Sequence, residues 1–498
     1  MNGSRFLLGA VAQLSSRGVM LASGFVQFLY LSRTLGPEGY GLYSVAFSLN
    51  LLVFSVVDPA LTSGLVTMLG GDSRGRAFAR TSARLVLGVG LLLVLVAWGV
   101  APWVARFLQT PELVGPLRCL APALLLQLLS MHSSQCLVGE GRWYAPASSL
   151  SLMWLTRLAV GWVLVENGWG AMGAAAAVPV SFLLQFLTNQ LQGAHWVWQP
   201  GAMLLRDWWS HSRHLMAGSM LHNLVYGMDL PVLKRFVSAT EAGQYAAAQN
   251  LGLPVQSLCL SLLPMLQQRL AKTRNEEPTE QLTRLCGLVI RLWLCLAVGI
   301  GALSVLGSDL GRLLFGPRYD QSGRIGEILL VELGFRCVLW PQFTILAAQQ
   351  ERHRVSRIYS WAAPPLLLMY AVVLTVGSRL GLDQQPNRLL LLCAGLGIVR
   401  TGVLAWLMMA QVRQVVSVPF PWRTLGRALV AGGVAAAVAT RLPGDGWAVL
   451  SQVVVLVGTY AGLLLLWGES LDRPTRTRGG LGWPEQETNL AEEEPGLV

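Results

Sequence analysis

A stripe of polar side chains runs along the first long apolar stretch of the chain. Its members are Gln13, Arg17, Gly24 and Gln27, and their spacing places them on one face of an α-helix. Arg17 lies near the middle of the stretch and has no carboxylate one turn away. Because a guanidinium stays charged and donates paired hydrogen bonds to phosphate, we expect Arg17, Gln13 and Gln27 to bind an anionic substrate.

Two further arginines, Arg157 and Arg400, lie within other apolar stretches. A charged group inside a membrane is costly unless it faces the interior of a helix bundle or a water-filled cavity. Neither arginine has an acidic residue one turn away, so each needs a partner on another helix, in water or on a ligand. We therefore expect both to join Arg17 in a cationic site for phosphate.

The last two arginines within apolar stretches are expected to have structural roles and not to bind a substrate. Arg336 follows Glu332 by four residues, which is the spacing of an ion pair along one helix face. Arg291 lies near the end of its stretch, where its side chain can extend to the lipid headgroups.

Asp58 and Asp229 are carboxylates within apolar stretches. A carboxylate in the membrane can bind a proton or Na⁺ and so couple an ion gradient to transport. It can equally be the countercharge of an arginine on a neighbouring helix. Both residues are therefore candidates for ion coupling, with the countercharge as the alternative.

The histidines and cysteines are not spaced as in metal sites or catalytic sites. His211, His214 and His222 share a helix face, but the first two lie at its entry and do not indicate a metal site. The seven cysteines lie in or beside apolar runs and form no C-x-x-C pair, and no P-loop for ATP is present. We expect no metal, no cofactor, no catalytic residue and no enzymatic activity.

The composition indicates which kind of structure must position these polar and charged side chains. Of the 498 residues, 53% are hydrophobic and 13% are charged, whereas a soluble domain has about 25% charged residues. The apolar runs accommodate about fourteen helices that cross a bilayer, joined by short connections. The fold class is therefore an all-α polytopic membrane protein, and soluble enzymes are excluded.

The basic residues indicate orientation rather than nucleic-acid binding. The net charge is +11, and the arginines gather in short loops between apolar runs. With the N-terminus inside, inner loops carry about twice as many Arg and Lys residues as outer loops, which predicts that both termini are cytoplasmic. We expect contact with the lipid bilayer and no contact with nucleic acid.

A repeat divides the chain into two halves. The segment Leu31–Ala46 reads LSRTLGPEGYGLYSVA, and Leu233–Ala248 reads LKRFVSATEAGQYAAA. Each has a basic residue, a short turn, a Glu and then G-x-Y at the start of a helix. Six spans separate the copies, so the halves are predicted to be parallel repeats about an axis along the membrane normal.

This repeat predicts five regions. They are a six-helix bundle over 1–193, an amphipathic linker over 194–211, a second six-helix bundle over 212–413, two extra transmembrane helices over 414–468 and a disordered cytoplasmic tail over 469–498.

The first copy of the repeat resembles bacterial polysaccharide flippases, which transfer O-antigen and other oligosaccharide repeat units. These belong to the multidrug, oligosaccharidyl-lipid and polysaccharide exporter superfamily. The stretch RTLGPEGYGLYSVAFSLNLLVFSVVDPAL is similar to the entry of the family's second span, with Pro59-Ala60-Leu61 after Asp58 in place of the usual glycine setting. The stretch MDLPVLKRFVSATEAGQYAAA is similar to the turn between the seventh and eighth spans, with Asp229 at the expected aspartate.

The resemblance implies a transporter with two six-helix bundles around a central cavity, working by alternating access. Its substrate would be a polyprenyl-diphosphate-linked glycan, carried across the inner membrane of a bacterium for lipopolysaccharide or another surface polysaccharide. Glycan polymerase or chain-length machinery would be its partners.

Two other functions are weighed against this one. A cation-coupled multidrug exporter of the same superfamily should favour carboxylates at the midplane, whereas this chain carries slightly more arginines there. A membrane glycosyltransferase or polymerase would need catalytic residues in a sizeable outer loop, and the outer loops are short.

Overall fold

The computed structural model describes most of the chain. The described residues are 3–62, 65, 69, 73–142, 144–199, 220–276, 279–349, 351–381, 385–416, 418–442, 444 and 446–467. They form helices and short connections, with no strand among them. The predicted fold class, an all-α polytopic membrane protein, is confirmed.

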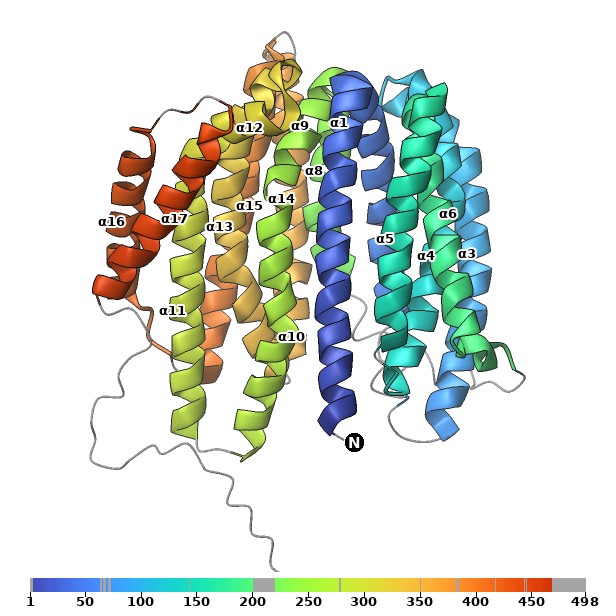
Figure 1. The fold of residues 1–498 in the computed structure, drawn as a ribbon, viewed down its shortest axis with the longest axis horizontal. Coiled ribbons are helices and arrows are strands. Elements are labelled where there is room, and N and C mark those ends of the chain that lie inside the picture. The colour runs from blue at the N-terminus through green and yellow to red at the C-terminus, as the bar shows by residue number, and fades with distance from the viewer. Residues whose placement is uncertain are drawn as a thin grey trace, which may run out of the picture.

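The N-terminal helices pack against one another. They are α1 (Gly3–Thr62), α3 (Ser73–Phe107), α4 (Val114–Gly139), α5 (Tyr144–Leu164) and α6 (Gly170–Leu191). Helix α4 contacts α1, α3 and α6, and α5 contacts α1 and α6. Figure 1 shows α3 to α6 on one side of the molecule, with the first half of α1 standing between them and the later helices.

Helix α1 contains two of the predicted spans. Gly36 interrupts it with a φ of 67°, a left-handed conformation that favours glycine. Pro37 follows, and proline fits the first turn of a helix because its missing N–H has no partner to lose there. The chain therefore reverses at this point, and the second half of α1 runs back alongside the first.

The later helices form a second group. They are a helical segment over 220–227, α8 (Asp229–Lys234), α9 (Ala239–Leu251), α10 (Leu253–Glu276), α11 (Thr279–Leu303), α12 (Gly307–Phe315), α13 (Asp320–Ala348), α14 (Arg352–Arg379) and α15 (Pro386–Val416). Helix α13 is central, because it contacts α9, α10, α11, α14 and α15. Two further helices, α16 (Trp422–Ala439) and α17 (Ala448–Leu466), pack on α11 at the outer flank (Figure 1).

A local signal starts the helix of the second repeat copy. The Ser238 hydroxyl accepts a hydrogen bond from the backbone N–H of Glu241 at 3.3 Å, and the Ser238 N–H donates to the Glu241 carboxylate at 2.7 Å. This capping box satisfies two backbone groups that a helix N-terminus would otherwise leave unpaired. It fixes where α9 begins, and α9 packs against α1.

Nine segments among the described residues are long and apolar enough to cross a membrane. Two of them each join a pair of predicted spans, Ser15–Pro59 and Tyr144–Leu191. The predicted division into regions stays a prediction, and most of the predicted linker and the whole predicted tail lie outside the described residues.

Candidate functional site

A cavity of about 510 Å³ lies between the second half of α1 and the C-terminal helices. Hydroxyl, amide and charged side chains form much of its wall. These polar residues are Ser48, Ser55, His222, Asn223, Tyr226, Asp229, Gln249, Asn250, Gln256, Glu332 and Arg336. The wall from α1 is uncharged, and every charged residue of the lining comes from α8 or α13.

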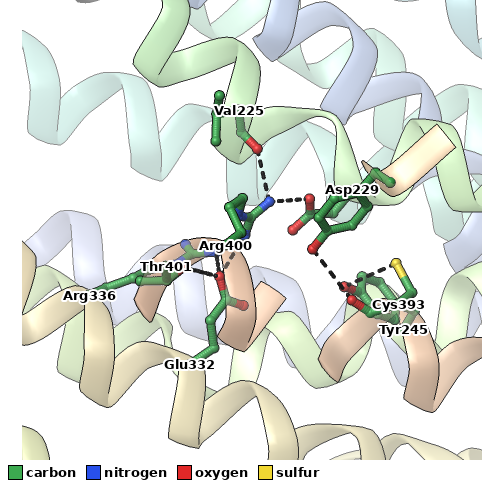
Figure 2. Close-up of polar contacts among 9 residues, drawn as sticks. Val225, Asp229, Tyr245, Glu332, Arg336, Cys393, Arg400 and Thr401 are labelled. Carbon is green, nitrogen blue, oxygen red and sulfur yellow. Dashed lines mark hydrogen bonds and ion pairs between the residues drawn. The ribbon is translucent and has the colours of Figure 1, made fainter. Parts of the chain in front are cut away.

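Behind the wall, Arg400 of α15 connects three elements (Figure 2). Its Nη1 donates to the backbone carbonyl of Val225 at 2.8 Å and forms an ion pair with Asp229. Its Nη2 donates to Glu332 Oε1 at 2.6 Å. The Arg400 side chain is 1% exposed, so its charge is compensated inside the protein rather than by solvent.

Glu332 is the centre of the same network. Its Oε1 also accepts hydrogen bonds from Arg336 Nη2 at 2.8 Å, Arg336 Nε at 3.1 Å and the Thr401 hydroxyl at 3.0 Å. The Tyr226 ring lies 4.8 Å from the Arg336 Cζ and 4.7 Å from the Arg400 Cζ, so it faces both guanidinium groups. Two carboxylates and two guanidinium groups together make a neutral cluster.

Arg400 and Asp229 are thus brought together, although 171 positions separate them. Asp229 has the role of countercharge that was one of its two interpretations. Its role in ion coupling stays a prediction. Arg400 is not among the residues that line the cavity, so its direct contact with a substrate also stays a prediction.

Arg157 lies elsewhere, inside the N-terminal helices. Its Nε donates to the Ser181 hydroxyl at 3.2 Å, and its Cζ lies 4.8 Å from the Trp154 ring and 4.9 Å from the Phe182 ring. The residue is 3% exposed and forms no ion pair with a described residue. Among the described residues, Arg157 Nη2 has no hydrogen-bond partner, and neither has Nε2 of the buried Gln27.

Arg17 and Asp58 are also not among the residues that line the cavity. Arg17 is half-buried on α1 and makes no ion pair or hydrogen bond with a described residue. Asp58 accepts a hydrogen bond from the Thr62 hydroxyl at 3.2 Å near the end of α1. The side chain of Gln13 lies outside the described residues, as do His211 and His214.

Part of the site was not predicted from the sequence. The ion pair of Arg336 with Glu332 is confirmed, but its position on the cavity wall was not expected. Gln249 and Gln256, seven positions apart, also line the cavity. That spacing is two helical turns and was the available signal for a polar face on this part of the chain.

Comparisons with known proteins agree with this architecture. The model of the family described as polysaccharide biosynthesis protein matches residues 9–265. A lipid II flippase MurJ in an inward closed conformation has a TM-score of 0.69 at 15% identity, covering 93% of this chain and 98% of its own. An inward-facing multidrug resistance MATE family transporter of the MOP superfamily has 0.67 at 14%, covering 82% and 98%.

A MOP superfamily transporter from Pyrococcus furiosus has a TM-score of 0.57 at 15% identity, covering 82% of this chain and 95% of its own. At these identities the likeness shows a shared fold. No curated protein matches the sequence. The family match spans more than half of the chain and confirms the resemblance indicated by the L-G-P-E-G-Y-G-L-Y turn. The chain belongs to the polysaccharide biosynthesis protein family.

Proposed function

We propose that this protein is an alternating-access flippase that moves a polyprenyl-diphosphate-linked oligosaccharide from the inner to the outer leaflet of a bacterial cytoplasmic membrane. The observation that carries the proposal is the cavity between α1 and the C-terminal helices, with its hydroxyl and amide lining. Such groups bind sugar hydroxyls. Membership of the polysaccharide biosynthesis family supports the same substrate class.

The described helices suit transport more than covalent chemistry. Moving a headgroup across the bilayer requires a polar path that opens to one side at a time, and no bond of the substrate needs to break. We therefore propose a transporter without enzymatic activity, with both termini in the cytoplasm. We also propose, as its partner, a glycan polymerase that receives the product on the outer side.

Export of a cationic drug is the main competing function, because Asp229 and Glu332 line the cavity. Both carboxylates are already paired with Arg400. A cationic drug would have to compete with this guanidinium, which is fixed in place. The neutral balance of the cluster therefore favours a ligand recognised through hydrogen bonds and a local anionic group.

A pair of tryptophan substitutions tests the proposed path. Ser55→Trp places a large side chain in the cavity, whereas Leu95→Trp lies on α3, where Leu95 is 71% exposed. In a strain that lacks its repeat-unit flippase, we expect the wild-type chain and Leu95→Trp to restore surface glycan and Ser55→Trp to fail at equal protein levels.

Purified protein in liposomes provides the direct measurement. We expect transfer of a fluorescent polyprenyl-diphosphate-linked glycan between leaflets, with ethidium movement as the comparison. Ethidium transport without glycan transfer would replace the flippase by the drug exporter. Failure to restore surface glycan together with failure to transfer the lipid-linked glycan would refute the proposal.

A further inference from the structure

The two guanidinium groups that share Glu332 differ in their freedom to move. The Arg336 side chain is 20% exposed and lines the cavity, whereas the Arg400 side chain is 1% exposed and does not. Both donate to the same oxygen, Glu332 Oε1, at 2.8 Å and 2.6 Å. One carboxylate oxygen thus holds a guanidinium on the cavity side and another in the interior.

Arg400 is fixed by several partners at once. It pairs with Asp229 and Glu332, donates to the Val225 carbonyl, and lies against the rings of two tyrosines. The ring centroids are 4.7 Å from its Cζ for Tyr226 and 5.3 Å for Tyr370. Removing this side chain from its position would leave the buried Asp229 without an ion pair and Glu332 with Arg336 alone, which is strongly unfavourable.

Arg336 has fewer partners. Its Nε and Nη2 donate to Glu332, and its guanidinium faces the Tyr226 ring. Its Nη1 makes no hydrogen bond with a described residue. A donor that lacks a protein partner on a cavity wall is available to a ligand.

Glu332 keeps an ion-pair partner when Arg336 turns away, although Arg400 is then shared between Glu332 and Asp229. The Glu332 Oε1 still accepts hydrogen bonds from Arg400 at 2.6 Å and from the Thr401 hydroxyl at 3.0 Å. The pair of Glu332 and Arg336 can therefore open without creating an isolated buried charge, which is the usual cost of breaking such a pair.

We infer that Arg336 exchanges Glu332 for a phosphate group of the ligand, and that Arg400 stays behind as the fixed countercharge of Glu332. This inference rests on the proposed function and assigns the anionic part of the substrate to one end of the cavity. The fork of Arg336 binds two phosphate oxygens in parallel. The uncharged side chains of Ser48, Asn223, Gln249 and Gln256 remain for the sugars.

Protection of a cavity cysteine by a short polyprenyl diphosphate measures this contact. Ser48→Cys is introduced into a variant without the seven native cysteines, and the protein is purified into lipid nanodiscs. The probes are farnesyl diphosphate and farnesol, and the readout is the rate of maleimide labelling against probe concentration. Farnesyl diphosphate should protect the cysteine at lower concentration than farnesol.

Three substitutions of arginine then locate the phosphate. Arg336→Gln should raise the farnesyl diphosphate concentration for half-protection about tenfold to a hundredfold, the loss of one charge-assisted interaction. Arg336→Lys should give a smaller but measurable increase, because the charge remains and the fork is lost. Arg324→Gln is the matched control, since Arg324 is exposed on the same helix, α13, and does not line the cavity.

Two results would overturn the inference. One is half-protection in Arg336→Gln at the wild-type concentration, and the other is equal protection of the wild-type protein by farnesol and farnesyl diphosphate. If Arg336→Gln does not fold, as judged by gel filtration, an unchanged half-protection in Arg336→Lys overturns it instead. The proposed function is tested separately by the restoration of surface glycan. If the wild-type chain restores surface glycan and any of these results is obtained, the Arg336 contact is refuted and the proposed function stands.

Discussion

Gly41 and Gly243 hold corresponding places in the two copies of the repeated turn, and their backbones are in contact. A β-carbon at Gly41 would overlap the carbonyl oxygen of Ala239, and one at Gly243 would overlap the carbonyl oxygen of Pro37. The approach is reciprocal, which is the arrangement that the predicted parallel repeats would give to two equivalent turns. Only glycine allows the second half of α1 and α9 to come this close.

Hydrogen bonds between the two groups of helices surround this glycine contact. Asn250 Nδ2 donates to the Tyr40 hydroxyl at 2.6 Å, and the Tyr319 hydroxyl donates to the Ser32 carbonyl at 2.8 Å. Arg33 donates to the carbonyls of Leu313 and Leu314 at the end of α12, both at 2.9 Å. The contact lies just after the reversal of α1 at Gly36, and the first half of α1 runs from the N-terminus to this reversal (Figure 1). The contact therefore joins the two groups of helices at the end where α1 turns back.

Gly41→Ala should weaken the contact between the second half of α1 and α9. The added methyl group must push α9 away from α1, at a cost of about 1–3 kcal/mol for overpacking. A cysteine at Ser48 should then be labelled faster by an impermeant maleimide added to intact cells. Gly88→Ala is the control, because a β-carbon at Gly88 would meet nothing within 4 Å. Equal labelling rates in the two variants would show that the glycine contact does not limit access.

Much of the fold could be predicted from the sequence, because bilayer thickness and helix geometry set the length of each apolar run. Gly36 and Pro37 also indicate a reversal of the chain, because glycine permits a positive φ and proline fits the start of a helix. The pair of Glu332 and Arg336 was also readable, since four positions make one helical turn. These features depend only on residues that are close together in the chain.

The partners of Arg400 could not be predicted in this way. Asp229 lies on α8 and Glu332 on α13, and which helix faces α15 depends on the packing of the whole group. Asp229 and Arg400 carry opposite charges without a partner one turn away, which indicates that each needs a partner on another helix, in water or on a ligand. The residue types alone leave the pairing open, and Arg400 was therefore predicted to contact a substrate.

Arg400→Gln should reduce the stability of the protein. It leaves Asp229 without an ion pair in the interior, and a buried pair broken on one side costs about 3–5 kcal/mol. The melting temperature in detergent should fall clearly, whereas Arg324→Gln should leave it unchanged. Arg400→Lys should not restore it, because one ammonium group cannot reproduce the planar fork that reaches Asp229, Glu332 and the Val225 carbonyl. An unchanged melting temperature in Arg400→Gln would contradict the assigned role.

The orientation of the chain can be tested at two exposed positions. Glu38 lies beside the turn of α1, and Arg76 lies at the start of α3. The excess of basic residues in the expected inner loops predicts that Arg76 is cytoplasmic and that Glu38 is outside. In a background without native cysteines, an impermeant thiol reagent should label Glu38→Cys in intact cells and label Arg76→Cys only after lysis. The reverse pattern would invert the topology.

Arg17 carries the remaining prediction about the substrate. It is half-buried on α1 and makes no ion pair or hydrogen bond with a described residue, so its charge is not compensated as that of Arg400 is. A group in this situation is expected to bind an anionic ligand during part of the transport cycle. Arg17→Ala should weaken glycan export about tenfold to a hundredfold, the worth of a charge-assisted hydrogen bond, and Arg17→Lys should restore it only in part.

The measurement is surface glycan in a flippase-deficient strain at matched protein levels, with Arg324→Ala as the control. The double variant with Arg17→Ala and Arg336→Gln tests whether the two arginines contact the same diphosphate or act at different steps of glycan export. If both arginines contact the same diphosphate, the double variant should lose less than the product of the two single effects, because residues that share a ligand are not additive. Independent effects would place Arg17 at another step of transport. Full export by Arg17→Ala would assign this residue to the structure of α1.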